Sequence, residues 1–135
     1  MAKKKRKPKR KYPKKQPLTE DAALEIAWRD HPEYRREFDR GELPDEVIGE
    51  DGRPMSPMAH VSLHAVVERQ LAADEPKGVV AIAQELEQLG ASRHDVRHAI
   101  AGVMAGHMWY MMKERCPFDE PRYMADLQKV VESHR

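Results

Sequence analysis

Several features are scarce or missing in this sequence of 135 residues, and each limits what the protein can be. Cys116 is the single cysteine, which excludes an intramolecular disulfide and is consistent with a reducing compartment. No run approaches the roughly 18 apolar residues of a membrane span, and no apolar core follows the first positive charges as in a secretory signal. We therefore expect a cytoplasmic protein that does not engage a membrane.

Motifs of common catalytic and nucleotide-binding sites are missing too. There is no haem-attachment motif and no glycine-rich phosphate loop, and the HExxH pattern of zinc proteases fails because Val61 and Asp95 stand where its glutamate would be. The sequence therefore favours a protein that is not an enzyme. If the protein catalyses a reaction, a bound metal ion would activate a water molecule, and Glu68 or Asp95 would be the candidate general acid or base.

Acidic residues are absent before Glu20, while ten basic residues lie in that stretch. These are Lys3, Lys4, Lys5, Arg6, Lys7, Lys9, Arg10, Lys11, Lys14 and Lys15. Removing these ten from the 24 Lys and Arg leaves 14 against 23 Asp and Glu, a net charge near −9 for the remainder. We expect residues 1–17 to be a disordered basic segment that binds the backbone of RNA or DNA, for example on the ribosome. The alternative is a solubilising segment that folds back on the acidic body.

Helical periodicity and capping residues predict an all-α protein with a single domain over residues 18–135. Thr19, Ser56 and Ser92 are typical N-caps, and the first helix should break at His31-Pro32. A helix should open at Asp74, another should start near Asp119, and residues 42–57 read as a loop without strands. The expected architecture is a compact bundle of four main helices with one or two short ones.

The longest predicted helix runs from Ser92 to about Arg115 and is apolar almost all round from Ala99 to Met112. This pattern predicts a central helix that is buried on several sides. Gly102 and Gly106 each cost a helix interior about 1 kcal/mol relative to alanine, so we expect a closely packed neighbouring helix or a cavity above a metal.

Two histidine pairs carry the main functional signal. HVSLHAVVE at 60–68 and HDVRHAIAG at 94–102 each place two histidines four residues apart, on one side of a predicted helix. The set His60, His64, His94 and His98 could converge on one transition-metal ion, with zinc as the default and nickel, copper or iron as alternatives. Glu68 is a further candidate ligand or could orient a ligand imidazole, and Asp95 could do the same. The alternative is that these histidines are polar helix-edge residues hydrogen-bonded to Glu68 and Asp95.

Three stretches resemble an uncharacterised bacterial family of small proteins that carry a domain of unknown function. The stretches are HPEY at 31–34, HVSLHAVVERQLAADEPKGV from residue 60, and HDVRHAIAGVMAGHMW from residue 94. The resemblance covers about residues 18–130 and implies a cytoplasmic helical bacterial protein whose shared signature is the same four histidines. The long basic segment departs from the shorter, less charged starts typical of that family. For His31 itself we expect a capping role at the helix break, and for His107 a hydrogen-bonded place in the core.

Overall fold

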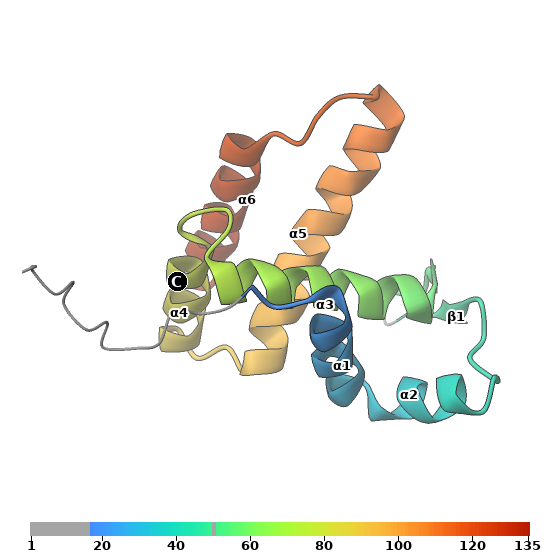
Figure 1. Ribbon diagram of the computed structural model, residues 1–135. Helices are drawn as coiled ribbons and strands as arrows, with labels where there is room; N and C mark the ends of the chain where they lie inside the picture. Colours follow the sequence, from blue (N-terminus) through green and yellow to red (C-terminus); the bar gives the residue numbers. More distant parts are fainter. Residues whose placement is uncertain (1–16, 50) are drawn as a thin grey trace, which may run out of the picture.

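A computed structural model describes residues 17–49 and 51–135 as six helices and one very short hairpin (Figure 1). The helices are α1 (Glu20–Asp30), α2 (Pro32–Asp39), α3 (Pro57–Ala73), α4 (Val79–Gln88), α5 (Arg93–Glu114) and α6 (Glu120–Ser133). The predicted all-α class is therefore confirmed. Among the described helices, none combines the length and hydropathy that crossing a membrane requires. The basic residues 3–15 lie outside the described part of the chain.

The predicted N-caps determine where three of the helices begin. The side chains of Thr19, Ser56 and Ser92 each accept a hydrogen bond at 3.1 Å from the backbone N–H three residues later. Each bond satisfies one of the N–H groups that the first turn of a helix leaves unpaired. The predicted break at His31 is also confirmed, because α1 ends at Asp30 and α2 begins at Pro32.

Two local predictions were wrong. Asp74 does not open a helix but ends α3 in the left-handed conformation, and its carboxylate accepts hydrogen bonds from the N–H groups of Gly78 and Val80. The stretch predicted as a loop contains a two-stranded antiparallel ladder, β1 (Val47–Ile48) and β2 (Pro54–Met55). Each strand has only two residues, which is too short to give an alternating strand pattern in the sequence.

Helix α3 crosses α5, with α1 on one side of the crossing and α4 and α6 on the other (Figure 1). On the first side, Trp28 of α1 packs in a cluster with Val61 and Ala65 of α3. On the second side, α4, α5 and α6 share a larger core that includes Leu86 and Leu127. The crossing of α3 and α5 therefore separates two apolar clusters, and polar residues on the facing sides of these helices meet there.

Helix α5 is central over only part of its length. Ile100 and Met104 are buried, but Trp109 is 61% exposed and Met112 is 76% exposed. The prediction of a helix buried on several sides was therefore wrong for its second half, which extends beyond α3 (Figure 1). A Cβ atom added at Gly102 or Gly106 would have no atom within 4 Å, so no closely packed helix covers these glycines in the described part of the chain.

A candidate metal centre

Helix α3 presents its two histidines to α5 on the same side. Their ring centroids lie 4.6 Å apart, as expected for residues one helical turn apart. His64 is 1% exposed and His60 is half-buried. The neighbouring residues Val61 and Ala65 pack against α1, and this packing fixes the rotation of α3 that turns both imidazoles toward the α3–α5 crossing.

The second histidine pair comes from the first half of α5. The His98 ring lies 5.4 Å from that of His60 and 5.8 Å from that of His64, and the His94 ring lies 5.9 Å from that of His64. Both residues of this pair are exposed. The structure thus turns the two pairs toward each other, with the α3 pair inside and the α5 pair toward solvent.

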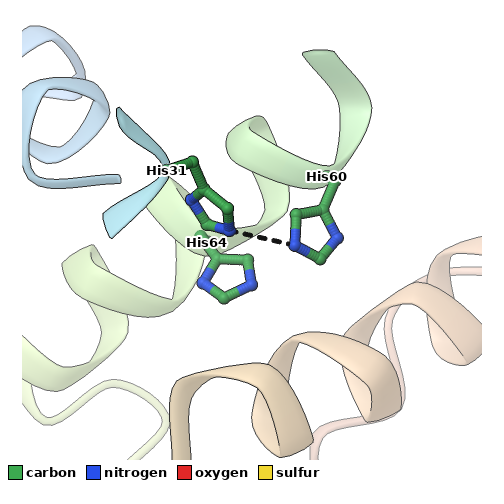
Figure 2. Close-up of side chains that lie close together, drawn as sticks. All are labelled: His31, His60 and His64. Atoms are coloured by element: carbon green, nitrogen blue, oxygen red, sulfur yellow. Dashed lines mark hydrogen bonds between the residues drawn. The ribbon is translucent and has the colours of Figure 1, made fainter. Parts of the chain in front are cut away.

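A fifth histidine, His31, joins them from the junction between α1 and α2 (Figure 2). Its Nδ1 lies 2.8 Å from the carbonyl oxygen of Ala27, which can only accept, so a neutral His31 carries its proton on Nδ1. Its Nε2 lies 3.1 Å from Nε2 of His60 and accepts the hydrogen bond drawn in Figure 2. The Nε2 lone pair of His31 is therefore directed into the cluster.

Sequence reasoning missed this role of His31. The expected capping role at the helix break is present, because His31 is the C-cap residue of α1 and its backbone N–H donates to the carbonyl of Trp28, but the contact of its ring with the other histidines was not predicted. The available signal was the position of His31 in HPEY, directly before a proline at which one helix ends and the next begins.

The inner set consists of His31, His60 and His64. Each offers one ring nitrogen, and these nitrogens all lie within 4.8 Å of one another. Their ring centroids are 4.6, 4.7 and 4.9 Å apart. Imidazoles that share one ion with metal–nitrogen bonds of about 2.1 Å have centroids roughly 5 Å apart. Small side-chain rotations would therefore suffice for the three rings to share an ion.

Burial makes His60 and His64 reluctant to take up a proton. Burial first, and then the positive charge that neighbouring imidazoles can carry, lowers the pKa of His60 to about 4 and that of His64 to about 3. Neither ring nitrogen of His64 has a hydrogen-bond partner among residues 17–49 and 51–135. His60 and His64 therefore stay neutral near pH 7, which is the form in which an imidazole nitrogen binds a metal ion.

Glu68, predicted as a further ligand, is engaged elsewhere. Its Oε1 accepts hydrogen bonds from Arg97 at 2.7 Å and from Arg93 at 3.1 Å, and Arg93 also binds Asp30 at 2.9 Å. No hydrogen bond joins Glu68 or Asp95 to a histidine within the described residues, so the carboxylate partners that the helix-edge alternative expects are missing. The ion pairs of Glu68 instead tie α3 to α5, and the pair of Arg93 with Asp30 ties α5 to α1.

An open pocket of about 780 Å³ adjoins the histidines. His31, His60, His94 and His98 line this pocket, together with residues of the short β1–β2 hairpin. A small molecule or ion can therefore reach the cluster from solvent without unfolding. His107 lies apart from this pocket, where its Nε2 is 2.7 Å from a carboxylate oxygen of Asp126, so the prediction of a hydrogen-bonded core histidine is confirmed.

Comparison with known proteins places the chain in one family. Residues 4–129 match the family described as a domain of unknown function, DUF1841. The match begins inside the basic segment, earlier than residue 18, so most of that segment falls within the matched region. No curated protein and no solved structure matches the chain significantly.

Proposed function

The chain belongs to the DUF1841 family, and from the geometry of its histidine cluster we propose that it binds a transition-metal ion. The inner set of His31, His60 and His64 supplies three ligands. His98 or His94 of α5 completes the coordination. Zinc is the first candidate, and the role we propose is structural or sensing.

One observation carries this proposal: His64 is buried without a hydrogen-bond partner for either ring nitrogen in the described structure. An unpaired buried polar group costs about 1–3 kcal/mol, and such groups are rare in native proteins. A metal ion bound by one of these nitrogens would offset that cost. If residue 64 only filled space in the core, leucine would be more favourable, because it has a similar volume and no polar atoms.

The chemistry of the donors supports the same assignment. The cluster offers only imidazole nitrogens, which suit zinc, copper, nickel and iron and bind magnesium or calcium poorly. His31 already donates its Nδ1 proton to a backbone carbonyl, the arrangement that usually orients a metal-bound histidine. An ion here would link the α1–α2 junction to α3 and α5, and its binding would therefore stabilise the fold.

The deciding experiment is metal analysis of untagged protein. We would remove metal with a chelator, add one ion at a time and measure bound metal after gel filtration. The matched variants are His64→Leu inside the cluster and His107→Leu outside it. We expect about one equivalent in the native chain and in the His107 variant, and almost none in the His64 variant. Negligible metal in the native chain, or equal metal in all three proteins, would refute the proposal.

A second candidate function rests on the charge of the basic segment. Ten basic residues before the first acidic one would bind RNA or DNA with little sequence preference, mainly through counterion release. Replacing all ten by glutamine in the full chain should abolish RNA binding that falls steeply with salt. If affinity and salt slope stay unchanged in that variant, the basic segment does not bind nucleic acid.

A further inference from the structure

Among residues 17–49 and 51–135, no element covers one side of α5 over most of its length. The residues on this side are Asp95, Ala99, Gly102, Gly106, Trp109 and Lys113. They follow one another at alternating spacings of four and three, and at 100° per residue they fall within about 80° of the helix circumference. Ala99 is half-buried and the other five are exposed. We call this set the open α5 face.

The centre of the open α5 face is shaped for close approach by another helix. Gly102 and Gly106 have no atoms near the place of a Cβ, although alanine would favour the helix at both positions. Trp109 projects beside them, with the Lys113 ammonium 4.8 Å from its ring centroid. A groove next to a large exposed aromatic ring is typical of a surface that receives a partner.

The open α5 face is complementary to itself, and we propose that it pairs antiparallel with the same face of a second copy of the chain. Its residues are arranged symmetrically about position 104. In the antiparallel pair, Gly102 therefore lies opposite Gly106 of the second copy, and Ala99 lies opposite Trp109, a small residue against a large one. At each end, Asp95 faces Lys113 of the second copy, so opposite charges meet.

Charge complementarity is the reason to assign this face to a second copy. The acidic residue stands at one end of the stripe and the basic residue at the other, so two copies bring opposite charges together at both ends when they pair antiparallel and like charges when they pair parallel. The part of α5 that extends beyond α3 in Figure 1 would then lie beside the first half of α5 of the second copy. A contact made mainly by one helix is smaller than a standard interface, so we expect association at roughly micromolar concentrations.

The first test measures association by sedimentation of the full chain in chelator, so that metal binding cannot affect the result. Gly102→Gln with Gly106→Gln fills the groove at positions that are open in the monomer, and it should weaken association at least tenfold. Ile48→Gln is the control, because Ile48 is 71% exposed but lies outside the open α5 face. A native chain that stays monomeric at several hundred micromolar, or a dimer that the glycine variant leaves intact, overturns the proposal.

The second test exchanges the end charges. Asp95→Lys and Lys113→Asp should each weaken association several-fold, and the double variant should restore it to within about twofold of native. The two residues lie about 27 Å apart along their own helix, so the restoration requires contact between copies. Circular dichroism checks that each variant keeps its helices. Additive weakening in the double variant would overturn the antiparallel pairing.

Discussion

Two regions of this molecule each contain an inward-facing histidine, and they differ in whether that histidine has a hydrogen-bond partner. At the far end of the bundle, His107 of α5 pairs with Asp126 of α6, and the hydrogen bond lowers the pKa of that carboxyl group. At the α3–α5 crossing, His64 is more deeply buried and has no partner in the described structure. The first histidine is explained by the fold that surrounds it. The second has no such explanation among residues 17–49 and 51–135, and this difference is what motivates the proposed metal site.

The largest expected effect is a loss of zinc affinity when His64 is replaced, with little loss when His107 is replaced. His64→Leu should raise the Kd for Zn²⁺ by about 100-fold or more, because an inner ligand is lost. His107→Leu should change it by less than threefold. Competition titration against a chromophoric chelator measures both values. Similar losses in the two variants would mean that bound zinc does not occupy the α3–α5 cluster.

Glu68 provides the next test, because the sequence suggested it as a ligand and the structure pairs it with Arg97 and Arg93. Glu68→Gln should leave metal stoichiometry unchanged and destabilise the metal-free protein by about 2–3 kcal/mol, since it breaks a largely buried ion pair. Urea unfolding and metal analysis of the same preparation give both numbers. A stable variant that has lost its metal would restore Glu68 as a ligand.

The two leucine variants should change the stability of the metal-free protein in opposite directions. We expect His64→Leu to stabilise it by about 1–2 kcal/mol, because an unpaired buried polar group is removed. His107→Leu should destabilise it by a similar amount, because Asp126 loses its hydrogen bond. Urea denaturation in chelator would show this. Destabilisation by both would indicate that the His64 ring is satisfied in the native state.

The last effect is the dependence of stability on pH. Histidines with a pKa lowered to about 4 and 3 bind protons more readily when unfolded, where the value is near 6.5. Stability of the metal-free protein should therefore fall as the pH drops from 6.5 toward 4, by up to about 1.4 kcal/mol per pH unit for each group. The His64→Leu variant should have a shallower slope over this range. The Asp126 carboxyl, with its lowered pKa, stabilises above pH 3.8 and loses this effect only below it.

Much of the fold was readable from local pattern. The caps at Thr19, Ser56 and Ser92 and the break before Pro32 are properties of a few consecutive residues, and the structure has them where the sequence predicts. The exposure of Trp109 was not readable in this way. The sequence of an apolar helix side is the same whether a neighbouring helix covers it or not. Whether the second half of α5 is covered depends on the lengths and crossing angles of α3 and α6.

The candidate site, too, could be predicted only in part from local sequence. By itself, the sequence determined that each histidine pair lies on one side of its helix, because a spacing of four is close to one helical turn. Only the tertiary structure decided that the pairs face each other, that His31 joins them and that Glu68 turns to the arginines. These contacts depend on how far each helix is rotated about its axis when it packs. Apolar contacts from distant parts of the chain, such as Trp28 against Val61, set that rotation.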